Sequence, residues 1–245
     1  MQNYKLTETK IGTAKVVVDI LPKGKVIPNT TIKPTSITIH MTGNVGASAR
    51  NNHNYMKNCN KNGSRIASWH FTCGYDEILQ AIPTNKKGYH AGCSQGNNSS
   101  IGIEIAMYND KEKQLQAYKN AIELVKILMK YHKFSTSQVK RHYDWTKKHC
   151  PAWLIEGKWG YTWSWFKNQL NTITTVKKDT SFLVKIIYEG KEGLNIRQDN
   201  NTKSKIMGQV YYNEVYTIVE VKGDWGRLKS NVGWISLNAK YVKKI

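Results

Sequence analysis

A histidine and a cysteine stand eight residues apart in the segment HYDWTKKHC, which runs from His142 to Cys150 and is followed by Pro151. Imidazole nitrogen and thiolate sulfur are common side-chain ligands of zinc in proteins. A catalytic zinc site uses three protein ligands, because its fourth position must remain open for water. The segment therefore predicts two ligands of such a site, and the third must come from elsewhere in the chain.

His40 is the best candidate for the third ligand. It lies near the end of the β-branched segment SITIHM, which predicts a strand, and the polar residues TGNVGAS follow soon after. The end of a strand presents its side chain rigidly at the rim of a sheet. A lone histidine is more often structural than a ligand, but a strand-end histidine together with a distant histidine and cysteine predicts a zinc site made of His40, His142 and Cys150.

Zinc in such a site lowers the pKa of bound water to about 7 and polarises an amide carbonyl. Amide hydrolysis also needs a carboxylate that takes the proton of the water and passes it to the departing amine. Glu104 is the candidate because it is the charged residue of the apolar segment SIGIEIAMY; a glutamate in a salt bridge at the sheet rim is the alternative. Lys148 is placed to stabilise negative charge on the tetrahedral intermediate, and the residues alone do not separate it from Lys147.

These residues need a scaffold, and the apolar pattern predicts an α/β domain over residues 1–172. Alternating and β-branched segments predict strands at 15–20, 36–41, 68–75, 77–83 and 100–108. Apolar residues at spacings of three and four predict a helix over 114–134, and further helices are expected at 47–62 and 161–170.

The composition and the apolar pattern of the sequence change after this domain. Residues 173–181 lack periodicity and are rich in Thr and Lys, which predicts a linker. Residues 182–245 contain only short strand-like segments with Gly and Asn between them, which predicts a small all-β barrel. This part is rich in tyrosine and tryptophan, and about half of the following six residues are expected in its core: Tyr211, Tyr212, Tyr216, Trp225, Trp234 and Tyr241.

Five segments occur in an order that resembles a known family: ITIHMTGN, SWHF, GYHAG, SIGIEIA and HYDWTKKHCP. They resemble the zinc-dependent N-acetylmuramoyl-L-alanine amidases of the type 2 class, related in fold to phage T7 lysozyme and to peptidoglycan recognition proteins. The resemblance covers about residues 30–170, and HYDWTKKHCP is its most specific piece. It implies a mixed central sheet flanked by helices, zinc binding by His40, His142 and Cys150, activation of water by Glu104 and oxyanion support by Lys148.

The C-terminal part resembles bacterial SH3-like wall-binding domains in the segments GLNIRQDNNTKSKIMGQV and DWGRLKSNVGWISLNAKYV. Together the two resemblances imply a peptidoglycan hydrolase that cleaves the amide between N-acetylmuramic acid and L-alanine and is tethered to the wall. The alternative is a non-catalytic recognition protein that binds peptidoglycan. Loss of the thiolate ligand would mark such a binder, and Cys150 is present.

The formal net charge of +20 indicates a polyanionic partner, although lysine-rich chains are often simply soluble. The excess of basic residues extends over both parts of the chain, which favours an anionic wall polymer, and no nucleic-acid-binding motif is present. No apolar run approaches the ~20 residues that span a bilayer, so membrane insertion is not expected. The start of the chain lacks an export signal, which favours a phage endolysin held in the host cytoplasm over an autolysin exported by another route. A monomer is favoured.

Several residues depart from the family pattern or stay open. Several amidases of this class carry a tyrosine where this chain has Trp69, so Glu104 is expected to perform the proton transfer alone. For His90 and His70 two roles are open: each either contacts the substrate or serves as a structural hydrogen-bonding group. Asp144 orients either its own loop or a ligand histidine.

The remaining histidines and cysteines receive no role in the chemistry. His149 adjoins Cys150 and would strain to reach the same ion, and His53 and His132 are expected on helix surfaces. Three cysteines are predicted to be ordinary thiols, and a disulfide framework is not expected without an export signal: Cys59, Cys73 and Cys93.

Overall fold

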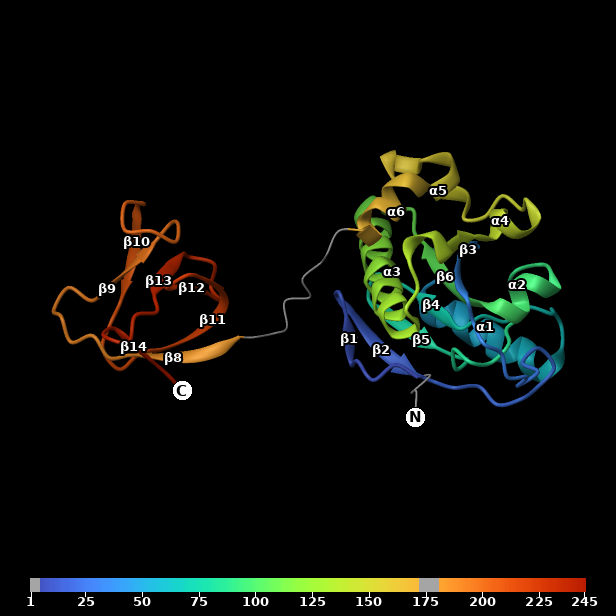
Figure 1. Cartoon of the computed structure of the whole chain (residues 1–245), viewed down its shortest axis with the longest axis horizontal. Helices are drawn as coiled ribbons and strands as arrows, with labels where there is room; N and C mark the ends of the chain where they lie inside the picture. Colours follow the sequence, from blue (N-terminus) through green and yellow to red (C-terminus); the bar gives the residue numbers. More distant parts are fainter. Residues whose placement is uncertain (1–4, 172–180) are drawn as a thin grey trace. The chain divides into compact units, whose positions relative to one another are not determined.

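The computed structural model describes residues 5–171 and 181–245 of the chain (Figure 1). The chain divides into two compact units, Met1–Ile173 and Thr174–Ile245. The predicted linker at 173–181 lies outside the described residues except for Ser181. Within the described ranges, no helix is both long and apolar enough to cross a membrane.

A seven-stranded mixed sheet forms the centre of the first unit, in the order β1-β2-β5-β4-β6-β3-β7. Its strands are β1 (Lys10–Ile11), β2 (Ala14–Val18), β3 (Ser36–Val45), β4 (Phe71–Cys73), β5 (Glu77–Gln80), β6 (Ser100–Met107) and β7 (Val139–Arg141). Strand β3 runs parallel to both of its neighbours, β6 and β7. The antiparallel pairs are β1 with β2 and β4 with β5. The predicted α/β fold with a mixed sheet is confirmed.

Helices lie against this sheet (Figure 1). They are α1 (Ala49–Asn62), α2 (Ser94–Ser99), α3 (Lys111–His132), α4 (His142–Thr146), α5 (Ala152–Glu156) and α6 (Trp163–Asn171), with 3-10 turns η1 (Thr136–Gln138) and η2 (Lys158–Gly160). Helix α3 begins three residues before the predicted start, because the Asp110 side chain accepts a hydrogen bond from the backbone N–H of Lys113 and caps it. It ends at His132, and the following cap residue, Lys133, adopts the left-handed conformation.

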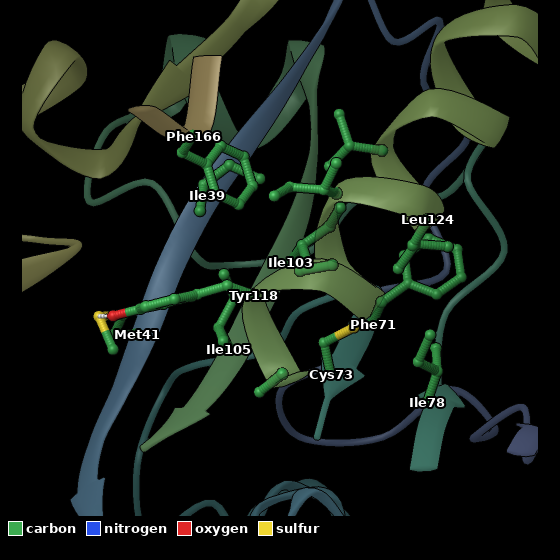
Figure 2. Packing of buried hydrophobic residues seen from close by; sticks show 14 of the residues in the cluster. Ile39, Met41, Phe71, Cys73, Ile78, Ile103, Ile105, Tyr118, Leu124 and Phe166 are labelled. Carbon is green, nitrogen blue, oxygen red and sulfur yellow. Dashed lines mark hydrogen bonds between the residues drawn. The ribbon is translucent and has the colours of Figure 1, made fainter. Parts of the chain in front are cut away.

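The main core lies between the sheet and helices α3 and α6, and Figure 2 shows part of it. Alternate residues of β3 and β6 enter this core, among them Ile39, Met41, Ile103 and Ile105. Tyr118 of α3 is fully buried there, and its hydroxyl lies 3.9 Å from the sulfur of Met41. Because side chains alternate along a strand, the residues between these aliphatic positions must face the other side of the sheet.

A second, smaller core packs α1 with the segments before β3 and after β5. It contains Met56 and Cys59 of α1 together with Leu21, Val26, Ile27, Trp69, Ala81 and Ile82. His53 of α1 was expected on the helix surface, and this prediction is wrong: its side chain is fully buried, with Nε2 3.0 Å from a carboxylate oxygen of Asp19. The helical pattern alone does not reveal that a distant acidic residue covers this position. His132 is half-buried at the end of α3, and its Nε2 lies 3.1 Å from the Thr84 hydroxyl.

The second unit is all-β, with seven antiparallel strands in the order β10-β9-β13-β12-β11-β8-β14. They are β8 (Phe182–Ile186), β9 (Leu194–Arg197), β10 (Ile206–Val210), β11 (Val215–Lys222), β12 (Trp225–Leu228), β13 (Trp234–Ser236) and β14 (Val242–Lys244). Its core is mainly aliphatic. Of the six aromatic residues singled out in the sequence, Trp234 is buried, and Tyr216 and Tyr241 pack partly against the core. Tyr211 and Tyr212 are about half exposed and available to a ligand.

The core of the first unit predicts a specific loss of stability. Ile103→Ala removes a fully buried side chain at the centre of the sheet. We expect the free energy of unfolding to fall by about 2–5 kcal/mol, measured by denaturant unfolding. Ile66→Ala is the matched control, because Ile66 is 74% exposed. The control should change stability by no more than about 0.5 kcal/mol, and equal losses in the two variants would contradict the packing described.

Candidate metal centre

Three neighbouring parallel strands place polar side chains at one level of the sheet. His40 of β3 is the register partner of Glu104 on β6. On the other side of β3, Ile39 pairs with Arg141, so that His142 follows β7 at the level of His40. The strand alternation that sends Ile39 and Met41 into the main core turns His40 to the opposite face.

The segment from His142 to Cys150 closes on itself and returns the cysteine to the histidines. The backbone N–H of Tyr143 donates to the carbonyl of Cys150 at 2.9 Å. Lys147 ends α4 in the left-handed conformation, which reverses the chain. Asp144 accepts hydrogen bonds from the backbone N–H and the guanidinium of Arg141, so it orients this loop and not a ligand histidine.

The structure brings together His40, His142 and Cys150, which are 1%, 5% and 6% exposed. Their ligand atoms all lie within 4.8 Å of one another. The Nδ1 atoms of the two histidines are 3.1 Å apart, and Sγ of Cys150 lies 3.9 Å from Nδ1 of His40.

The two distances from His40 are close to those around one tetrahedral ion. With metal–nitrogen bonds of about 2.0 Å and a metal–sulfur bond of about 2.3 Å, tetrahedral angles place two nitrogens about 3.3 Å apart and nitrogen and sulfur about 3.5 Å apart. The observed 3.1 and 3.9 Å, both measured from His40, lie close to these values. The three ligand atoms spread over up to 4.8 Å, so His142 and Cys150 must move closer together when an ion binds. The site therefore has the donor types of a three-ligand metal centre and two of its three spacings.

Burial sets the protonation of the ligands. It lowers the pKa of His142 to about 4, with a further decrease from the nearby Lys148, and it holds the pKa of His40 well below its usual value. Both imidazoles are thus neutral at pH 7, as metal binding requires. Burial also raises the pKa of the Cys150 thiol to about 12, so a thiolate at this position needs a cation beside it.

Glu104 faces the same space as the ligands. Burial raises the pKa of its carboxyl to about 7, and the positive charges of Lys148 and Arg65 oppose that rise. Its Oε2 atom is buried and accepts no hydrogen bond from any residue that the structure describes. A carboxyl with a pKa near 7 exchanges protons readily at neutral pH.

A cleft of about 480 Å³ opens over the ligands and Glu104. Lys148 lines it, whereas the ammonium of Lys147 lies 5.1 Å from the centre of the Tyr143 ring. The structure thus distinguishes Lys148, which lines the cleft, from Lys147, which does not; the sequence alone left this choice open. Arg65 also lines the cleft, and it was not predicted, because it stands in a polar segment after α1 that shows no pattern.

The other candidate residues have different surroundings. Trp69 lines the cleft, and its indole N–H donates to the Thr72 hydroxyl. His149 pairs with Glu156 at 2.9 Å and is not one of the clustered ligands. His70 is fully buried, with Nε2 bonded to the carbonyl of Lys86. The four cysteines are free thiols.

Comparison with known proteins identifies the family. Residues 30–153 match the family model for N-acetylmuramoyl-L-alanine amidase, and residues 192–243 match that of the bacterial SH3 domain. The chain belongs to the N-acetylmuramoyl-L-alanine amidase family. The resemblance noted in the sequence is confirmed for both parts.

Relatives of this amidase family occur in Bacillus subtilis (strain 168). The amidase XlyA is 38% identical over 157 residues, which are 62% of this chain and 50% of XlyA. The amidase CwlH is 33% identical over 183 residues, 70% of this chain and 69% of CwlH. The chain therefore spans about half the length of XlyA and just over two thirds of CwlH.

Solved structures of the family share the fold of the first unit. The catalytic domain of XlyA is 36% identical, covers 64% of this chain and 99% of its own, and gives a TM-score of 0.57. PlyL is 29% identical, with 64% and 96% covered and a TM-score of 0.55.

Replacement of the sulfur ligand tests the metal centre. Cys150→Ser keeps the size of the side chain but removes the thiolate, which soft and borderline metals prefer to a hydroxyl. We expect zinc affinity, measured by competition with a chromophoric chelator, to fall by at least about tenfold. Cys73→Ser is the matched control, because Cys73 is also buried but lies in the main core. Unchanged affinity in Cys150→Ser would contradict the ligand set.

The buried histidines predict how stability depends on pH. Burial lowers the pKa of His70 to about 4, whereas the unfolded chain has its ordinary value near 6.5. Between these values the unfolded state binds more protons, so the metal-free protein should lose stability as pH falls from about 6.5 to about 4. His70→Asn should flatten this slope in denaturant unfolding. Ile66→Ala, at an exposed position without a titratable group, should leave it unchanged, and equal slopes in all three proteins would rule out the buried neutral His70.

Proposed function

We propose that the chain hydrolyses the amide bond between N-acetylmuramic acid and L-alanine of peptidoglycan, with zinc held by His40, His142 and Cys150. The observation that carries the proposal is the single cleft shared by these three ligands, Glu104 and Lys148. Membership in the amidase family favours hydrolysis over binding without cleavage. Retention of Cys150 among the clustered ligands favours it further.

The zinc ligands, Glu104 and Lys148 have different tasks in this reaction. Zinc, when bound, supplies a Lewis acid that polarises the carbonyl and lowers the pKa of water to about 7. Glu104 takes a proton from the attacking water while the water oxygen forms a bond to the carbonyl carbon. It then gives this proton to the nitrogen of L-alanine as the carbon–nitrogen bond breaks.

Lys148 stabilises the charge that develops on the substrate. It lies on the rim of the cleft, and its charge already affects the pKa of both Glu104 and His142. A cation that lines the cleft stabilises the oxyanion of the tetrahedral intermediate more than it stabilises the neutral amide. Trp69 has no acid or base to contribute, which leaves the proton transfers to Glu104.

The division of labour along the chain belongs to the same proposal. We assign catalysis to residues 1–172 and wall binding to residues 182–245, with a linker at 173–181. A bound SH3-like domain raises the local concentration of substrate without changing the chemical step. The net charge of +20 suits a wall that carries anionic polymers. We place the action of the chain at the cell wall, as a monomeric endolysin that reaches it from the host cytoplasm, with an exported autolysin as the alternative.

Mass spectrometry of digested peptidoglycan tests the function. The wild-type protein should release stem peptides with a free L-alanine amino group and leave intact glycan chains. Glu104→Gln keeps the shape of the side chain and removes its acid and base, so the rate should fall by about 10² to 10⁴-fold while zinc content stays unchanged. Glu77→Gln, on the same sheet but paired with Arg50, is the control. Cleavage within the glycan or between peptides, or near-normal turnover of Glu104→Gln, would refute the assignment.

A further inference from the structure

A third histidine lies directly behind the ligand His40. His90, in the segment GYHAG, is 7% exposed, and its ring meets that of His40 edge to face with centroids 5.2 Å apart. Its Nδ1 lies 3.1 Å from Nε2 of His40, on the side of His40 away from His142. Its Nε2 lies 3.2 Å from the backbone carbonyl of Ser100. Both nitrogens of His90 are therefore engaged inside the protein, and neither is free to contact a substrate.

These contacts determine where the protons lie. A carbonyl oxygen only accepts hydrogen bonds, so Nε2 of His90 must carry the proton that bonds to Ser100. Neutral His90 then presents a lone pair at Nδ1, and Nε2 of His40 must donate to it. His40 in turn has no proton on Nδ1. This is the nitrogen that faces His142 and Cys150.

The same loop also contacts the second histidine ligand. The backbone carbonyl of Ala91, next to His90, raises the pKa of the His142 ring, against the larger lowering by burial. The Nδ1 of His142 lies 3.1 Å from Nδ1 of His40, so in the metal-free protein it can donate a proton to the His40 lone pair. The contacts of His40 with both neighbouring histidines are therefore compatible with an unprotonated Nδ1 on His40.

The surrounding backbone makes room for this arrangement and keeps it in place. The backbone N–H groups of His90 and Ala91 both donate to the side-chain oxygen of Asn97. Gly102 of β6 lies against the His90 ring, and a Cβ at that position would lie only 2.6 Å from Cγ of His90. A glycine at 102 is therefore a steric requirement for His90 to reach His40.

We propose that His90 is a positioning residue that holds His40 in the tautomer with Nδ1 free for the metal. The inference rests on the metal site of the proposed function but not on the reaction that the site performs. Partners of this kind orient a metal ligand, and their loss typically lowers metal affinity about 10 to 100-fold.

Two nearly isosteric replacements isolate the hydrogen bond. His90→Asn places an amide oxygen near the position of Nδ1 and keeps an acceptor for His40, whereas His90→Leu has similar volume and no acceptor. His70→Leu is the control, because His70 is equally buried and its ring lies against His90, but it bonds to Gly102 and Lys86 and not to His40.

Zinc affinity and the tautomer of His40 are the two measurements, on the full chain. Chelator competition should show zinc binding about 10 to 100-fold weaker in His90→Leu, with smaller losses in His90→Asn and His70→Leu. In the metal-free protein, long-range ¹H–¹⁵N correlation spectra should show His40 protonated on Nε2 in the wild type and His90→Asn. In His90→Leu the His40 signals should move toward the other tautomer.

The outcomes separate this inference from the proposed function. Equal zinc affinities in His90→Leu and His70→Leu, with an unchanged His40 tautomer, would overturn the inference and leave the hydrolase intact. A wild-type protein that binds no zinc would overturn the proposed function. If His90→Leu does not fold, Gly102→Ala keeps every histidine and displaces the His90 ring, and it should weaken zinc binding in the same way; normal zinc binding would overturn the inference.

Discussion

The structure depends on a buried thiol and two buried imidazoles that meet at one point of the sheet. Burial disfavours the Cys150 thiolate, and the His40 nitrogen that faces His142 and Cys150 carries a lone pair. One divalent cation between the three side chains would stabilise the thiolate and accept the lone pairs of the imidazoles. Binding of a metal would therefore be linked to the stability of this region, and the hydrogen bond between His40 and His90 keeps the His40 ring oriented for it.

The scaffold follows from the need to present these groups rigidly. Parallel strands β6, β3 and β7 carry Glu104 and His40 and lead into His142 at one level, while their alternate residues form the main core. A one-residue shift of register in β3 would exchange His40 for Ile39 or Met41 at the site. The burial that stabilises the sheet thus also fixes the geometry of the centre. The second unit has its own aliphatic core and leaves Tyr211 and Tyr212 exposed.

Much of this arrangement was predictable from the sequence, and the features that were not predicted have physical reasons. Residue types and strand patterns predicted the α/β fold and pointed to the histidines and cysteine that the structure brings together. Strand β7 was missed because three residues, VKR, show no alternation. The choice between Lys147 and Lys148 depended on a left-handed turn, and the burial of His53 depended on Asp19, 34 residues away. The contact of His90 with His40 spans 50 residues, and no local pattern reports it.

X-ray absorption spectroscopy of the zinc-loaded protein tests the central claim most directly, since it reports the atoms bound to the metal. The account predicts two nitrogen scatterers at about 2.0 Å and one sulfur at about 2.3 Å, with a further light atom in the fourth position. The sulfur should disappear from the spectrum of Cys150→Ser. A spectrum of the wild-type protein without sulfur, or one with two or more sulfurs, would contradict the metal centre on which the proposed reaction depends.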